Sequence, residues 1–275
     1  MVNQEFIMTN MTSANGYLPI TSAIVIIGDE IIGGRVKDTN SSYIAKKLIE
    51  RGISVNEIRI SGDNGPQIVE TVKFIRNGVD YAFVTAGIGP THDDITAENI
   101  AKAFGVKLVK NQKAYEAISN YYSGQELTAE REKMSYIPDN AEIIPNPLTA
   151  APGFYIENVF VMAGIPKIMQ GMLDHVLEKL EKGSKIYFKT ITCSMSESII
   201  APKLREIQND HPDVTIGSYP HFRKGELNLS IALKSFNAQE LEMAERKLLD
   251  KIYECDRNPH TVSFTNENFI ELDTE

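Results

Sequence analysis

The residues best suited to chemistry gather in residues 85–94, which read Thr-Ala-Gly-Ile-Gly-Pro-Thr-His-Asp-Asp. A strand pattern breaks here into glycines just before a helical pattern. Such a loop can direct backbone N–H groups at an anion, with help from the helix N-terminus. The carboxylates of Asp93 and Asp94 would repel a phosphate unless a divalent cation such as Mg²⁺ took oxygen atoms from both. We therefore predict a phosphate cradle with a metal, whose ligand-contacting residues are Gly87, Gly89, Pro90 and Thr91.

A structural interpretation of the same loop stays open. Asp94 or Thr96 would then cap a helix that begins near Ala97, and capping is compatible with ligand contact. His92 could stack on a ligand or titrate beside it, although a single loop histidine more often does neither.

A second acidic loop follows the first predicted strand. Gly28 allows a sharp turn there, and Asp29 or Glu30 is a candidate to face a ligand or metal. Asp38 and Asn40 follow closely. The alternative is a turn with solvated acids, in which Asp38 or Asn40 caps the next helix.

Small residues mark a third region, in residues 146–154 and 162–166. Gly153 and Gly164 would let the backbone approach a ligand closely. Pro166 equally suits an ordinary strand-to-helix turn, because proline is favoured at the first helical position.

These loops need a scaffold that brings strand ends together. Buried strand patterns alternate with helical ones from residue 23, which predicts a doubly wound, three-layer α/β domain with a parallel sheet. Ligands in that architecture bind beyond the carboxyl ends of the strands. The expected strands are 23–27, 55–60, 81–85 and 159–163, and the expected helices are 40–51, 66–76, 97–104 and 166–182.

The order of elements changes after Gly183. Residues 183–254 predict a smaller α+β domain with a β-α-β-β-α order, preceded by a domain at 22–182. A polar helical insertion is expected at 111–134. We expect a mobile tail at 1–21 and an acidic, frayed tail at 255–275.

Composition narrows the classes of partner. The chain has 275 residues, 28 basic against 37 acidic, and a formal charge of −9, which argues against nucleic acid as a partner. Cys193 and Cys255 are too distant for a zinc or redox motif. No apolar run approaches the roughly 20 residues that span a bilayer. We therefore expect a cytoplasmic protein with no membrane partner.

Together these loops resemble the CinA-type family, whose N-terminal domain is molybdopterin-binding-like (MoaB/Mog). The likeness covers residues 22–180 in order, through Gly-Asp-Glu with Asp-Thr-Asn behind it, Gly-x-Gly-Pro-Thr-x-Asp-Asp, Asn-Pro with Ala-Pro-Gly-Phe, and Gly-Ile-Pro. Residues 194–201 and 218–220 are similar to that family's second module.

The resemblance implies a MoaB/Mog fold, a homo-oligomer and a pyrophosphatase acting on ADP-ribose or a related dinucleotide, FAD included. It implies a divalent metal, Mg²⁺, Mn²⁺ or Co²⁺, and K⁺ is a further candidate. The motif positions that match are Asp29, Glu30, Asp38, Asn40, Gly87, Gly89, Thr91, Asp93 and Asp94.

The chain also departs from the family pattern. Ala86 replaces a glycine, Thr149 and Ala150 stand where Gly-Thr is usual, and Ile168 occupies a position that is often Glu. An added methyl can narrow a pocket, so substrate identity is the implication these changes affect most. The nicotinamide-mononucleotide deamidase domain of full-length members is not expected.

Three functions follow as hypotheses. The first is a metal-dependent pyrophosphatase in which Asp93 and Asp94 hold the cation and Asp29 or Glu30 positions water. The second is a molybdopterin-binding or adenylyl-transferring protein. The third is a non-catalytic ligand sensor. In each case the partner is a small nucleotide or pterin phosphate.

Overall fold

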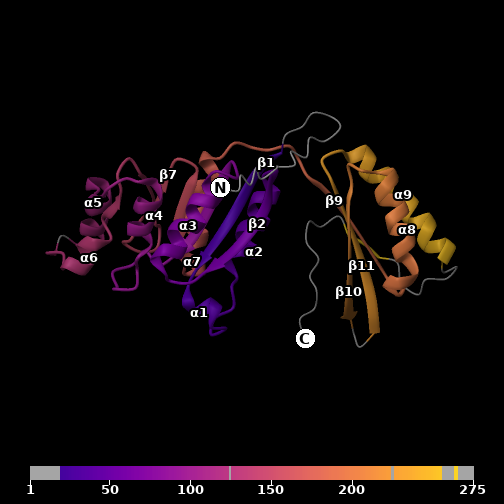
Figure 1. Ribbon diagram of the computed structural model, residues 1–275, viewed down its shortest axis with the longest axis horizontal. Helices are drawn as coiled ribbons and strands as arrows, with labels where there is room; N and C mark the ends of the chain where they lie inside the picture. Colours follow the sequence, from indigo (N-terminus) through magenta and orange to yellow (C-terminus); the bar gives the residue numbers. More distant parts are fainter. Residues whose placement is uncertain (1–18, 124, 224–225, 256–262, 266–275) are drawn as a thin grey trace, which may run out of the picture. The chain divides into compact units, whose positions relative to one another are not determined.

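The computed structural model describes residues 19–123, 125–223, 226–255 and 263–265, and these fall into two compact units (Figure 1). One unit is Pro19–Gly183, and the other begins at Ser184. Each has its own sheet, so Ile231 does not share a sheet with Val25. Residues 1–18 of the expected N-terminal tail lie outside the described residues, and the first strand begins at Ile20.

The first unit is built on a six-stranded sheet of order β2-β1-β3-β8-β7-β6. Its strands are β1 (Ile20–Ile27), β2 (Ile53–Ser61), β3 (Tyr81–Ala86), β8 (Val159–Ala163), β7 (Gly153–Ile156) and β6 (Glu142–Ile144). The first four are parallel, as predicted, whereas β7 pairs antiparallel with both of its neighbours, β8 and β6. The sheet is therefore mixed rather than parallel throughout. Only Glu157 and Asn158 separate β7 from β8, and so short a connection joins antiparallel neighbours.

Helices cover both faces of this sheet, which gives the predicted three layers. Helices α2 (Asn40–Glu50) and α7 (Pro166–Lys179) pack on the face that carries Ile24 and Phe83. Helices α3 (Gly65–Arg76) and α4 (Thr96–Phe104) pack on the face that carries Val25 and Val84. Neighbouring residues of β1 and β3 thus point into opposite cores, and burial of each such side chain contributes about 1.5–3 kcal/mol.

The strand order puts the topological switch point of the sheet at the carboxyl ends of β1 and β3. The chain leaves β1 through α2 to reach β2 on one side, and it returns through α3 to place β3 on the other side of β1. Connections that diverge in this way leave the strand ends open between them, where ligands of doubly wound sheets bind. The two predicted acidic loops follow these two strands.

The segment between α4 and β6 holds more structure than its polar sequence predicts. The expected helical insertion is two helices, α5 (Gln112–Tyr121) and α6 (Ala129–Lys133), which lie together at one end of the unit (Figure 1). Strands β4 (Leu108–Lys110) and β5 (Tyr136–Pro138) flank them and pair antiparallel. Three-residue strands were missed because they are too short to show a period of two.

The second unit follows the predicted β-α-β-β-α order. Its elements are β9 (Tyr187–Cys193), α8 (Glu197–Asp210), β10 (Thr215–Arg223), β11 (Glu226–Ser235), α9 (Ala238–Cys255) and β12 (Ser263–Thr265). The sheet has the order β10-β11-β9-β12 with antiparallel pairs, and α8 and α9 contribute Ile200 and Leu248 to its core. Strand β12 corrects the expectation of a wholly frayed tail, because backbone pairing with β9 orders those residues. In the described part of the chain, no helix is both long and apolar enough for a membrane span.

Candidate functional site

The loop after β1 begins with Gly28, which is held beside β2 because its N–H donates to the carbonyl of Ser61 at 3.0 Å. Its φ of 168° is extended backbone, so the turn itself does not require glycine, contrary to the sequence expectation. A Cβ at this position would lie 2.5 Å from Oε1 of Glu30, the end of a side chain that can rotate away. Asp29 and Glu30 open the short helix α1 (Asp29–Ile32), and both are exposed.

A carboxylate that the sequence analysis missed, Asp63, faces this loop from the end of β2. The N–H of Asp29 donates to Oδ2 of Asp63 at 3.0 Å, and the N–H of Asp63 donates to Oδ1 of Asp29 at 3.2 Å. Partial burial raises the pKa of Asp63; the Asp29 N–H opposes this, and the charges of Asp29, Glu30 and Asp93 add to the rise. Asp63 is therefore affected by the charges of both acidic loops, those of Asp29 and Glu30 in the first and that of Asp93 in the second. The sequence did contain a signal for Asp63, because Gly62-Asp63 after a strand repeats the pattern of Gly28-Asp29.

Asp38 and Asn40 hold the start of α2 in different ways. Oδ1 of Asp38 accepts from the N–H groups of Asn40 and Ser41, at 2.9 and 3.2 Å, so Asp38 holds the first amides of α2 from the position before the N-cap, which is Thr39 and makes no side-chain bond. Asn40 does not cap. It is buried, and its Nδ2 donates to the carbonyl of Gly164 at 2.7 Å, which ties α2 to the β8–α7 turn. Its Oδ1 is buried and has no hydrogen-bond partner among the described residues.

The loop after β3 closes around a carboxylate of its own. A Cβ at Gly87 would lie 2.5 Å from Oδ1 of Asp94, and a Cβ at Gly89 would lie 2.9 Å from its Oδ2. The N–H of Thr91 donates to Asp94 Oδ2 at 2.7 Å. Asp94 therefore lies where the sequence suggested a ligand anion, and the glycines leave room for it. It does not cap α4, whose N-cap is Ile95 without a side-chain bond.

One hydroxyl joins the adjacent carboxylates. Oγ1 of Thr91 lies 2.5 Å from Oδ1 of Asp93 and 2.6 Å from Oδ2 of Asp94, yet it has one proton to donate. The hydrogen bond from Thr91 lowers the pKa of Asp93, and the positive charge of Lys133 adds to this. His92 is almost fully exposed, 3.9 Å from Asp93. The hydroxyl of Thr96, the other expected cap, is buried without a partner in the described chain.

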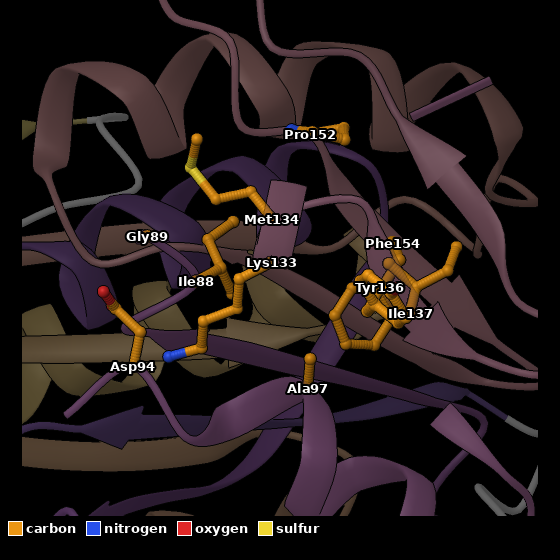
Figure 2. Close-up of a pocket in the computed structure, with 10 residues that line it drawn as sticks. All are labelled: Ile88, Gly89, Asp94, Ala97, Lys133, Met134, Tyr136, Ile137, Pro152 and Phe154. Atoms are coloured by element: carbon orange, nitrogen blue, oxygen red, sulfur yellow. The ribbon is translucent and has the colours of Figure 1, made fainter. Parts of the chain in front are cut away.

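A pocket opens beside this loop (Figure 2). Gly89 and Asp94 line it from the loop, and Lys133 extends toward Asp94 from the end of α6. The remaining lining is mostly apolar and aromatic: Ile88, Ala97, Met134, Tyr136, Ile137, Pro152 and Phe154. The arrangement places a cation, a carboxylate and a hydrophobic wall around one opening.

The third region, residues 146–154 and 162–166, lies partly at the rim of the sheet and partly in the core. Gly164 lies at the rim, where its N–H donates to the carbonyl of Ala86 at 2.9 Å, and Pro166 starts α7. Gly153 lies inside strand β7 rather than in a loop. A Cβ there would come within 2.5 Å of the carbonyl oxygen of Val161, so close packing of neighbouring strands explains this glycine.

The residues at the positions that depart from the family pattern are not among those that line the pocket. The methyl of Ala86 is buried in the core beneath α3 and α4, and Ala150 is buried against Ile118 and Met134. Neither residue lines the pocket. The hydroxyl of Thr149 accepts from Nδ2 of Asn146 at 2.5 Å, and Ile168 packs against the core beneath α2 and α7.

The donor set restricts which metal could bind. Within the described residues, no group of three or more His, Cys, Asp or Glu side chains is placed to hold an ion. Asp93 and Asp94 offer two carboxylates with more acceptors than the Thr91 hydroxyl can satisfy. Such a pair suits a hard cation such as Mg²⁺, which keeps several waters and takes its remaining oxygen ligands from substrate phosphates. An all-protein metal centre does not fit.

Comparison with known proteins identifies both units. Residues 23–182 match the model of the probable molybdopterin binding domain, and residues 185–256 match that of the FAD synthase middle domain. A protein from Archaeoglobus fulgidus is 40% identical over 197 residues, which cover 72% of this chain and 84% of the relative. A CinA-like protein from Thermosipho melanesiensis is 33% identical over 245 residues, 86% of this chain and 60% of the relative.

A solved structure agrees with these matches. The CinA protein of Thermoplasma acidophilum, described as having unknown function, shares 29% identity and a TM-score of 0.56 over 58% of this chain and 98% of its own. The central sheet with its helical layers, the domain order and the relatives all agree with the resemblance drawn from the motifs. The chain belongs to the probable molybdopterin binding domain family, in its CinA-type branch, with a domain of the FAD synthase middle type behind it.

Proposed function

We propose that the Pro19–Gly183 unit binds a nucleotide or pterin phosphate at the β1–β3 rim and hydrolyses a phosphoric anhydride, as in ADP-ribose or FAD, with a divalent cation. The supporting observation is the pair of carboxylates, Asp93 and Asp94, that converge on the single hydroxyl of Thr91. One proton cannot satisfy both, and a hard cation with bound phosphate can.

The family matches favour a ligand of this class. The two matching models are named for molybdopterin and for FAD synthase, and both names refer to phosphorylated heterocycles. The pocket beside Gly89 sets an apolar and aromatic wall next to Asp94 and Lys133. These features support the ligand class and leave the individual substrate to experiment.

The chain's residues divide the chemistry between them. Asp93 and Asp94 would hold the cation, which when bound would neutralise charge on the phosphoryl oxygens and lower the pKa of a nearby water. Asp29 or Glu30 would hold the attacking water. Its oxygen bonds to one phosphorus as the bridging P–O bond breaks, and its proton passes to that carboxylate and on to solvent. The products are two phosphate monoesters.

Asp93 is the better residue to substitute, because a change at Asp94 would also disturb the structure of its loop. ADP-ribose, FAD and dinucleoside polyphosphates are incubated with Mg²⁺, Mn²⁺ or Co²⁺, and released mononucleotide is measured. Asp93→Asn should reduce turnover about 100-fold or more, as loss of charge stabilisation in the transition state requires. The control is Glu98→Gln, an exposed carboxylate on α4 that pairs with Lys102. Wild-type turnover in Asp93→Asn would refute the assignment.

A second candidate is phosphate-ligand binding without hydrolysis. It is favoured by the hydrogen bonds that Asp94 already makes within its loop, which give it a structural role independent of metal. In that case wild-type protein binds a pterin phosphate or nucleotide in calorimetry and releases no mononucleotide from any substrate in the screen.

A further inference from the structure

The proposed site has an imbalance of charge. Five carboxylates surround the rim, those of Asp29, Glu30, Asp63, Asp93 and Asp94. A phosphate brought to this place needs positive charge from the protein as well as from any cation. Among the described residues that line the pocket, Lys133 is the one with a positive charge.

Lys133 reaches the β3 loop from a distant part of the sequence. It is the last residue of α6, and its Nζ donates to the carbonyl oxygen of Thr91 at 2.5 Å. The opposite side of Thr91 presents its hydroxyl to Asp93 and Asp94. Lys133 thus lies beside the residue that joins the two carboxylates, while its own hydrogen-bond partner is a neutral carbonyl.

The two basic side chains near Lys133, those of Lys110 and Arg131, make other kinds of contact. Lys110 forms a salt bridge with Glu132 at 2.9 Å, and the guanidinium of Arg131 lies 3.8 Å from the ring centroid of Tyr122. Both contacts hold α6 in place, and so does Met134, which is buried directly after it. The backbone that carries Lys133 is therefore anchored, whereas the Lys133 side chain is exposed and can exchange its neutral carbonyl partner for a charged acceptor.

We propose that Lys133 recognises the phosphate of the ligand. Its ammonium lies on the Thr91 carbonyl in the free protein and turns to a phosphate oxygen when a nucleotide or pterin phosphate binds. A charge-assisted hydrogen bond to phosphate is stronger than one to a neutral carbonyl, which favours the exchange. The inference rests on the proposed binding function but not on hydrolysis.

The alternative is that Lys133 only fastens α6 to the β3 loop. A fastener would affect the shape of the pocket, so its loss would weaken a phosphate-free ligand as much as a phosphorylated one. A phosphate-recognising lysine discriminates between the two, and its contribution falls as salt screens the charge.

The test compares AMP, inorganic pyrophosphate and adenosine by calorimetry at two salt concentrations, with wild type and three variants. Lys133→Met should weaken AMP and pyrophosphate about tenfold or more, leave adenosine unchanged and flatten the salt dependence of AMP binding. Lys133→Arg should stay within about threefold of wild type, because it keeps the charge. Lys102→Met, an exposed lysine on α4 paired with Glu98, should match wild type.

The outcomes separate the two proposals. Wild-type affinity of Lys133→Met for AMP and pyrophosphate, or an equal loss for adenosine, overturns the role of Lys133 and leaves the hydrolase standing. Lysine-dependent AMP binding without hydrolysis of any dinucleotide supports Lys133 and refutes the hydrolase. If wild type binds neither AMP nor pyrophosphate, the role of Lys133 is overturned, and the hydrolase is decided by the turnover screen alone.

Discussion

The loops after β1 and β3 contain similar residues and use them differently. Each begins with glycine and carries two adjacent acidic residues. After β1, the carboxylates of Asp29 and Glu30 are exposed, and the backbone N–H groups of Asp29 and Asp63 each donate to the other residue's carboxylate. After β3, Asp94 turns back beneath its own glycines and leaves Asp93 outside. The backbone hydrogen bonds around an acidic residue therefore decide whether its carboxylate faces solvent or is held within its own loop.

The largest effect should come from filling the space above Asp94. Gly89→Val places branched carbons where a single Cβ would already lie 2.9 Å from the Asp94 carboxylate, so the pair that faces Thr91 separates. We expect turnover to fall about 100-fold or more, as loss of a charge-stabilising group does. Steady-state kinetics on the substrate found in the screen measures this.

Gly28→Ala is the matched comparison on the other loop. Its added methyl meets only the end of the flexible Glu30 side chain, which can rotate away. We expect a change of a few-fold at most. Equal losses in Gly89→Val and Gly28→Ala would erase the distinction between the two loops.

An intermediate effect is expected from Asp38, which binds the first amides of α2. Asp38→Ala removes those acceptors and should lower the free energy of unfolding by about 1 kcal/mol, as loss of a helix cap does. Chemical denaturation measures the change. Turnover should remain within about twofold of wild type if this role is structural, and a much larger kinetic loss would move Asp38 into the ligand site.

The smallest effect concerns Asp63, whose pKa is raised in the folded protein by burial and by neighbouring carboxylates. A raised pKa means that the folded state binds the proton more tightly than the unfolded state. The resulting stability is present below the unfolded pKa and is lost as pH rises through the folded pKa. Asp63→Asn should therefore be more stable than wild type at pH 7 and equal to it at acidic pH, with a difference of less than about 1 kcal/mol because the group is only partly buried.

Thermal unfolding of wild type and Asp63→Asn across the acidic range tests this sign. The melting temperatures should converge at low pH and separate toward neutrality, with the variant higher. A variant that is less stable at neutral pH would show that the hydrogen bond from the Asp29 N–H outweighs the repulsion.

The scaffold of the site was predictable because its central strands are continuous apolar runs. Residues 23–27 and 159–163 form strands that are buried on both faces. Their unbroken apolar sequences can be recognised without knowledge of the tertiary contacts. Strands β4, β5 and β6 have three residues each and owe their formation to partners rather than pattern. The antiparallel pairing of β7 with β8 follows from the two-residue connection at Glu157 and Asn158, which is too short for a parallel crossover.

The site was predictable in its motifs and less so in its contacts. Asp93 and Asp94 were visible as a pair, but the inward turn of Asp94 depends on loop geometry that residue types do not encode. Asp63 lies there because β2 neighbours β1. Lys133 belongs to α6 and lies 42 residues away from Thr91 in the sequence. Hydrophobic periodicity cannot show that two such distant segments meet.

The central claim is that Asp93 and Asp94 hold a cation together with the phosphate of a nucleotide. Titration of Mn²⁺ into wild type and Asp93→Asn, followed by electron paramagnetic resonance with and without AMP, tests it without requiring turnover. The account predicts that AMP strengthens Mn²⁺ binding to wild type about tenfold or more and that Asp93→Asn abolishes this coupling. Mn²⁺ binding that is the same in both proteins, or unaffected by AMP, would contradict it.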